Sequence, residues 1–369
     1  MDGGGESMGR TAYGELYEKI RREIISGGYP YGSRLPGKRV LAEQNGISVI
    51  TAAHALEMLA DEGYVEMRER SGCYAAYRAS DDFPGREPEE PSRREMPEVP
   101  SSADVDGISF ALLAKRIRGV LAEQGEKLLE KTPNQGLLLL RQSLSGYLAR
   151  SRGILAEPEQ IILGAGAEYL YGLLTEILGG ERIWAIEQPS YEKIEQVYAA
   201  RGIRLDRLPL GRNGLQSEPL RRTKAGVLHI SPYRSYPSDV TASASKRAEY
   251  LKWGEEEGRV IIEDDYESEF AIQRKPMDTL FSQAVRGNVI YLNSFSRTIS
   301  SSLRAGYMVL PKNLLPLYHE RAGFYSCTVP ALEQYLLASL LDSGDFERHI
   351  RRVRRKLRAG EVGQGKQER

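Results

Sequence analysis

Hydroxyl and guanidinium side chains gather in one short segment that could bind a phosphate monoester. The segment YLNSFSRTISSSLRAGYMVLP, residues 291–311, contains Ser294, Ser296 and Arg304. Hydroxyls, backbone N–H groups and a guanidinium all donate hydrogen bonds to an anion when a tight loop brings them together. The alternative is a polar hairpin loop with one exposed arginine. These residues by themselves leave both interpretations open.

Two further segments carry groups that could contact the same ligand. The apolar segment Val260–Ile262 runs into the acidic sequence EDDYESEF, and residues 164–168 read GAGAE. A glycine-bearing turn between a strand and a helix places free N–H groups and the positive end of a helix dipole at one point, which favours a phosphate. Both segments also have a simpler interpretation, because an acidic run is usually a solvated loop and a lone Gly-x-Gly is usually a tight turn.

The order of these segments resembles the pyridoxal-phosphate (PLP) site of fold-type-I enzymes, in particular the aminotransferase-like half of MocR-type regulators. The family patterns I-I-E-D-D-Y-D-S-E-F, E-D-P-G-Y and S-G-x-Q-x-A/L resemble residues 261–270, residues 187–191 and the glycine turn. The resemblance implies that Asp264 pairs with the pyridine nitrogen, that Tyr266 bonds the ring hydroxyl and that Tyr191 stacks on the ring. It implies these cofactor-binding residues: Gly166, Ala167, Glu168, Tyr191, Asp264, Tyr266, Ser294, Ser296 and Arg304.

One residue departs from that family in a way that changes the chemistry. The family pattern S-F-S-K-T carries the lysine that binds PLP as a Schiff base, and this chain has Arg297 at that position. A guanidinium does not deprotonate in proteins, so it can be neither the nucleophile nor the base that transamination requires. We therefore expect no catalytic residue and no transaminase activity. PLP binding should be non-covalent and weak, or lost.

The N-terminal segment has the element order of a winged helix-turn-helix. Apolar periodicity predicts helices over residues 13–26, 38–44 and 49–62, followed by a strand pair. The motifs R-L-P at residues 34–36, G-I-S at 46–48 and E-G-Y at 62–64 resemble the GntR-type DNA-binding domain. The resemblance implies these DNA-binding residues: Arg34, Lys38, Arg39, Ser48, Thr51, His54, Arg68, Arg70 and Gly72.

The DNA-binding segment lacks one strong base reader. The commonest family pattern has an arginine directly after the serine, where this chain has Val49 and Ile50, so the usual partner of guanine is absent. His54 fits a surface helix residue as well as a DNA contact. Basic and acidic residues are nearly balanced here, so useful binding requires a homodimer and specific contacts.

The composition limits the number of domains and the classes of protein that remain possible. The chain has 369 residues, enough for two domains, and its 51 Lys and Arg balance 51 Asp and Glu. The two distant cysteines argue for a reducing cytoplasm and against a disulfide framework or a metal site. Because no apolar run approaches transmembrane length, we expect a cytoplasmic protein that does not contact the membrane.

These observations predict a division into four parts. Residues 10–79 form the winged helix, and residues 80–106, rich in proline and acidic residues, form a linker. Residues 107–345 alternate helices and strands, which predicts an α/β domain with a mostly parallel sheet. Residues 346–369 form a basic helix, predicted to end at Arg358, and a disordered tail. The family's small C-terminal subdomain is expected to be missing.

The combined prediction is a transcriptional regulator. Its winged helix should bind a double-stranded DNA operator, and its catalytically inactive aminotransferase-like domain should respond to a small amino-acid or PLP-type effector. Two alternatives remain open. One is a PLP-dependent aminotransferase with an accessory DNA-binding domain, and the other is a decayed, truncated regulator without a cofactor.

Overall fold

The computed structural model describes residues 12–68, 71–78, 108–266, 268–270 and 278–364. The chain forms two compact units, Met1–Glu98 (unit 1) and Val99–Arg369 (unit 2). The predicted linker, residues 80–106, lies outside the described residues.

Unit 1 is a winged helix-turn-helix, as predicted. Its described elements are α1 (Ala12–Ile25), α2 (Lys38–Asn45), α3 (Val49–Asp61), β1 (Val65–Arg68) and β2 (Gly72–Ala75). The two strands pair antiparallel and form the wing. Apolar side chains spaced along the three helices and the wing pack into one core, which includes Leu16, Ile20, Leu41, Leu56, Leu59 and Val65.

Local backbone chemistry sets the turn between α2 and α3. Gly46 ends α2 in the left-handed conformation, with φ of 65°, where glycine has no steric penalty. Ser48 then caps α3, because its hydroxyl accepts a hydrogen bond from the Thr51 N–H at 3.0 Å. These two residues fix where the second motif helix begins.

Unit 2 contains a mostly parallel sheet, so the predicted α/β class is confirmed. Within the described residues the strand order is β3-β10-β9-β8-β7-β4-β5-β6. The pairs β5/β4, β4/β7, β7/β8 and β8/β9 are parallel, whereas β10 runs antiparallel to both of its neighbours. The strand bounds are β3 (Ile161–Gly164), β4 (Ile183–Gln188), β5 (Arg204–Gly211), β6 (Gly214–Leu215), β7 (Val227–Ile230), β8 (Val260–Asp264), β9 (Val289–Ser294) and β10 (Gly306–Val309).

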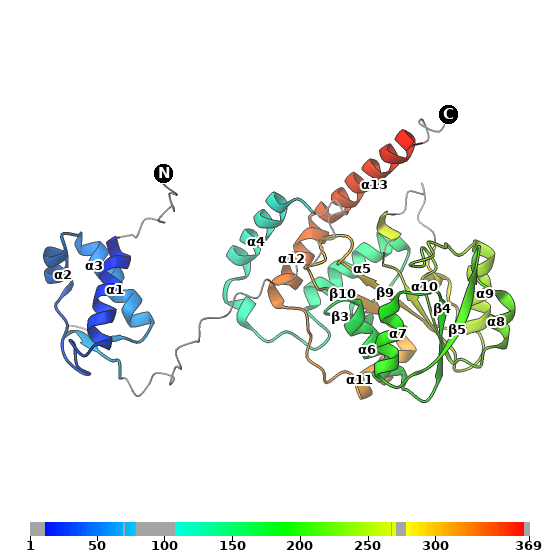
Figure 1. Ribbon diagram of the computed structural model, residues 1–369, viewed down its shortest axis with the longest axis horizontal. Coiled ribbons are helices and arrows are strands. Elements are labelled where there is room, and N and C mark those ends of the chain that lie inside the picture. The colour runs from blue at the N-terminus through cyan, green and yellow to red at the C-terminus, as the bar shows by residue number, and fades with distance from the viewer. Residues whose placement is uncertain (1–11, 69–70, 79–107, 267, 271–277, 365–369) are drawn as a thin grey trace, which may run out of the picture. The chain divides into compact units, whose positions relative to one another are not determined.

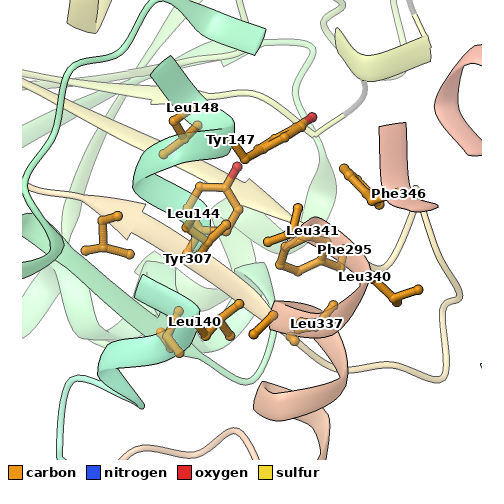
Figure 2. Packing of buried hydrophobic residues seen from close by; sticks show 14 of the residues in the cluster. Leu140, Leu144, Tyr147, Leu148, Phe295, Tyr307, Leu337, Leu340, Leu341 and Phe346 are labelled. Carbon is orange, nitrogen blue, oxygen red and sulfur yellow. The ribbon is translucent and has the colours of Figure 1, made fainter. Parts of the chain in front are cut away.

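Helices cover both faces of this sheet (Figure 1). Alternate residues of a strand point to opposite faces, so Tyr291 packs under α5 and α12 while Leu292 packs under α6, α7 and α11. Figure 2 shows leucines of α5 facing leucines of α12, with Phe295 and Tyr307 beside them. The helix bounds are α4 (Phe110–Gln124), α5 (Leu138–Arg152), α6 (Ala167–Leu178), α7 (Glu192–Ala200), α8 (Ser217–Arg222), α9 (Ala244–Gly254), α10 (Leu280–Gln283), α11 (Leu315–Arg321), α12 (Ala331–Asp342) and α13 (Asp345–Gln364).

The C-terminal helix corrects one prediction. Helix α13 continues to Gln364, so the helix end predicted at Arg358 is wrong. The start of α13 is anchored in the core by Phe346, Ile350 and Val353, and each further residue then adds a backbone hydrogen bond at little cost. Figure 1 shows the far end of α13 projecting beyond the rest of unit 2.

A buried ion pair joins α5 to the segment after β8. The Arg152 guanidinium lies 2.6 Å from an Asp265 carboxylate oxygen, and the side chains are 4% and 0% exposed. The same oxygen accepts hydrogen bonds from the Tyr291 and Ser268 hydroxyls, both at 2.7 Å. The Tyr233 ring lies 4.6 Å from the guanidinium carbon. The desolvated carboxylate is therefore bonded to two hydroxyls as well as to its cation, whereas the guanidinium packs against an aromatic face and its Nε has no hydrogen-bond partner among the described residues.

Removing one partner of this pair should destabilise unit 2 strongly. Arg152→Ala leaves the Asp265 carboxylate buried without its cation, which typically costs about 3–5 kcal/mol. Urea unfolding followed by tryptophan fluorescence reports on unit 2 alone, because the protein's two tryptophans, Trp184 and Trp253, both lie there.

Arg150→Ala on the same helix is the matched control. Its partner Glu347 lies 3.1 Å away, but the Arg150 side chain is 62% exposed, so we expect a change within about 0.5 kcal/mol. Equal losses of stability in the two variants would show that the buried pair has no special role.

Candidate functional site

A cavity of about 640 Å³ opens at the C-terminal ends of β7, β8 and β9. This edge of an open parallel sheet is where α/β folds usually bind ligands, and the volume is in the usual range for a small-molecule site. The lining comes from the start of α6, the segments after β4, β7 and β8, and the loop between β9 and β10.

The cavity brings together residues that lie far apart in the sequence. Of the residues that the sequence analysis assigned to a cofactor, those lining it are Ala167, Glu168, Tyr191, Asp264, Tyr266, Ser294, Ser296 and Arg304. Gly166, the remaining one, starts α6 with φ of 86°, and a Cβ there would lie 2.9 Å from Arg304 Nη2. Arg297 lies on the same cavity wall and is exposed. Their roles as ligand contacts stay predictions.

Asp264 lies at the buried end of the cavity and has one unused oxygen. Its Oδ2 accepts a hydrogen bond from Tyr171 at 2.5 Å and lies 3.3 Å from His229 Nε2. His229 Nδ1 in turn lies 2.7 Å from the Tyr198 hydroxyl. Asp264 is 3% exposed, and its Oδ1 has no hydrogen-bond partner among the described residues. A buried carboxylate oxygen without a donor is costly, so a ligand N–H placed there would be favoured.

The sequence analysis missed the three side chains that support Asp264. Tyr171, Tyr198 and His229 are all buried, and they pack on one another as aromatic rings. One signal was available: His229 is the polar residue in the otherwise apolar strand sequence VLHI. A polar side chain in a fully buried strand needs a partner, which here is the carboxylate on the neighbouring strand.

The acidic run after β8 is not a solvated loop. Its described carboxylates Glu263, Asp264, Asp265 and Glu269 are all buried, and among these four Asp264 alone lines the cavity. Glu263 accepts the N–H groups of Leu280 and Phe281 at 2.7 and 2.9 Å and so holds the start of α10. Burial raises the pKa of Glu263 to about 7. The other buried carboxylates of this segment therefore mainly fix the backbone around Asp264, whose side chain lines the cavity.

The cavity wall also carries an ion pair at the expected phosphate position. Arg304 Nη2 donates to a carboxylate oxygen of Glu168, and Lys193 Nζ donates to the other oxygen at 2.5 Å. Burial opposes ionisation of Glu168, but its bonds to Lys193 and Arg304 lower its pKa overall. Glu168 stands where the family pattern has glutamine. A fixed negative charge thus lies at the start of α6, against the cation that was expected to hold phosphate.

The predicted DNA-binding residues lie on unit 1. Exposed basic side chains lie just before α2 and in its first turn: Arg34, Lys38 and Arg39. Arg34 also lies against Gly72 of the wing. Arg68 bonds Glu66 at 2.8 Å and its guanidinium lies over the Tyr74 ring. Ser48 caps the start of α3, and Thr51 and His54 lie within that helix. Arg70 lies outside the described residues. No DNA contact is shown for any of them, so these assignments stay predictions.

Two other kinds of site find no support in the described part of the chain. None of its helices is long and apolar enough to cross a bilayer. Nor do three or more His, Cys, Asp and Glu side chains come together there in a way that could hold a metal ion.

Comparison with known proteins identifies both units. The model of the family "Bacterial regulatory proteins, gntR family" matches residues 12–75. The uncharacterized HTH-type transcriptional regulator YdeL of Bacillus subtilis is 31% identical over 354 residues, which is 94% of this chain and 76% of YdeL. The probable rhizopine catabolism regulatory protein MocR of Rhizobium meliloti is 28% identical over 92% of this chain and 74% of its own length. PdxR of Corynebacterium glutamicum, an HTH-type pyridoxine biosynthesis transcriptional regulator, is 29% identical over 93% and 76%.

A solved aminotransferase structure shows what unit 2 resembles. The α-aminoadipate aminotransferase LysN from Thermus thermophilus, complexed with N-(5'-phosphopyridoxyl)-L-leucine, matches with a TM-score of 0.60 and 28% identity over 67% of this chain. The match spans 64% of the LysN chain, less than two thirds. The similarity to YdeL and MocR runs through both units, so this chain belongs to the MocR-type regulators of the GntR family, in which a winged-helix DNA-binding unit is joined to an aminotransferase-like unit.

Proposed function

We propose that this regulator binds a PLP-type effector reversibly in unit 2, does not transaminate, and uses the bound effector to alter operator binding by unit 1. The observation that carries the proposal is Arg297, which lines the same cavity as Asp264 and Arg304 at the position of the family's lysine. An arginine there removes the covalent attachment but leaves the surrounding binding groups in place.

The chemistry of Arg297 argues against catalysis. A guanidinium stays protonated, so it offers no lone pair to attack an aldehyde and no base to move a proton at a substrate carbon. PLP supplies an aldehyde and an electron-withdrawing ring when bound, but this chain has no amine at position 297 to use them. Unit 2 is therefore proposed to act as a binding module.

The groups that line the cavity favour a particular kind of ligand. The unused oxygen of Asp264 would accept a hydrogen bond from a protonated ring nitrogen, and Tyr191 lies on the wall where a flat ring could stack. Ser294, Ser296 and the Arg304 guanidinium are donors for an anionic group. A phosphorylated pyridine fits this set, and the name of PdxR links that relative to pyridoxine biosynthesis.

Regulation requires only that the effector bind two states of the protein unequally. Winged-helix regulators commonly read two half-sites as a dimer, so we propose that a homodimer binds a palindromic or repeated operator. The effector would then shift the population of the state that holds the DNA.

The Arg297→Lys variant tests the proposal. If the rest of the site is intact, incubation with PLP followed by borohydride should give a covalent adduct at position 297, detected by mass and by visible absorbance before reduction. The unmodified protein should give no such adduct. Arg234→Lys is the matched control, because Arg234 lines the same cavity but does not occupy the family's lysine position, and it should not react.

Two results would contradict the proposal. A reducible PLP adduct in the unmodified protein would mean that another lysine attaches the cofactor. Absence of the adduct in Arg297→Lys would mean that the cavity does not hold the aldehyde near position 297.

Glu168 gives a second test of the same cavity. Its carboxylate repels an incoming phosphate and occupies Arg304, so Glu168→Gln should tighten binding of pyridoxine 5'-phosphate by about fivefold, the equivalent of about 1 kcal/mol. Calorimetric titration measures the affinity.

Glu176→Gln is the control, because Glu176 is exposed on the same helix and makes the same change of charge outside the cavity. If Glu168→Gln and Glu176→Gln bind pyridoxine 5'-phosphate with equal affinity, the phosphate does not bind at Arg304.

A further inference from the structure

The first turn of α3 presents apolar side chains where a recognition helix normally presents polar ones. Ile50 is 82% exposed and Val49 is 41% exposed, whereas Ala52 is buried in the core of unit 1. The N-terminal residues of the second motif helix are those that contact base edges in the major groove. The exposed pair therefore lies where sequence is read.

The polar side chains of the same turn are already engaged. The Ser48 hydroxyl accepts the Thr51 N–H at 3.0 Å and lies 2.8 Å from the Thr51 hydroxyl, so the two side chains cap the helix together. One turn further on, the His54 ring packs edge-on against Tyr13 with centroids 4.7 Å apart, and His54 lies 3.9 Å from Glu57. The three predicted polar readers are thus held by contacts within unit 1.

On the major-groove edge of the bases, the apolar group is the C5 methyl of thymine. We propose that Val49 and Ile50 read thymine methyl groups, so that operator specificity rests on apolar contacts in place of the usual arginine–guanine pair. The inference rests on the DNA binding that the proposed function includes, and it names the base that this turn recognises.

The expected size of the effect follows from the area of one methyl group. Burying a group of that size against an aliphatic side chain contributes about 0.8 kcal/mol, which is about fourfold in affinity for each contacted thymine. Such a contact discriminates less sharply than a bidentate arginine, so several thymines, two half-sites or both are needed for useful specificity.

The first step of the test identifies the DNA sequences that the protein binds. Duplexes with a random core are selected on the full-length protein, without effector, and sequenced. The inference predicts that thymine is enriched at the same position of both half-sites. Recovery of no bound sequence would overturn the proposed DNA binding and this inference together, whereas bound sites without a fixed thymine would overturn the inference alone.

The second step removes only the methyl group. Deoxyuridine replaces each enriched thymine in the selected duplex, and the dissociation constant should rise about fourfold for each contacted position. In Ile50→Ala that penalty should disappear at the thymine that Ile50 contacts, because the partner of the methyl group is gone, and it should persist at a thymine that Val49 contacts. Loss of affinity in Ile50→Ala that is the same on thymine and deoxyuridine DNA would overturn the inference.

Three controls separate methyl reading from other effects. Ile25→Ala removes an exposed isoleucine (45% exposed) at the end of α1 and should keep the full deoxyuridine penalty. Arg39→Ala should weaken binding to both DNAs alike if Arg39 contacts phosphate. Val49→Arg should shift the selected base toward guanine.

A change in oligomeric state in Ile50→Ala, measured by sedimentation, would show that this side chain packs against protein and would overturn the inference.

Discussion

A buried charge pair between Arg152 and Asp265 is the constraint on which the ligand cavity depends. Asp265 follows Asp264 directly, so anchoring Asp265 to α5 and to the Tyr291 hydroxyl of β9 fixes the chain direction at the end of β8. The Asp264 side chain is then held at the cavity by Tyr171, with one oxygen unused. A buried ion pair is a weak source of net stability, but breaking it is expensive, which makes it suited to holding one geometry.

Much of the fold could be predicted because its signals are local. Helix periodicity, the Gly46 turn and the Ser48 cap specify the winged helix, and buried strands ending in motif residues specify the α/β sheet. The contacts that the prediction missed join distant segments: Glu168 meets Arg304 across 136 residues, and His229 meets Asp264 across 35. The acidic run was ambiguous for the same reason, because nothing within the sequence EDDYESEF indicates that Arg152, 113 positions before Asp265, would neutralise one of its carboxylates. The helix beyond Arg358 was missed because its core contacts lie at its other end.

The two candidate sites share one feature. At each, the position that carries the family's strongest bond to its ligand holds a residue of different chemistry, Arg297 for a lysine and Val49 for an arginine. In both cases the surrounding framework is kept: Asp264 and the serines remain around the first site, and the Ser48 cap and exposed basic residues of α2 remain around the second. We therefore propose altered binding on a retained scaffold for both sites, with reversible ligand binding in unit 2 and apolar base reading in unit 1.

Comparing two ligands tests whether unit 2 binds its effector reversibly and without covalent attachment. Pyridoxine 5'-phosphate has the ring nitrogen, hydroxyl and phosphate of PLP but an alcohol in place of the aldehyde. Calorimetric titration of each into the unmodified protein, followed by borohydride treatment and the mass of the denatured chain, separates the two modes of binding. We expect the two ligands to bind with similar affinities and the mass of the chain to show no stoichiometric increase. Binding of PLP alone, with a mass increase of one cofactor after reduction, would contradict it.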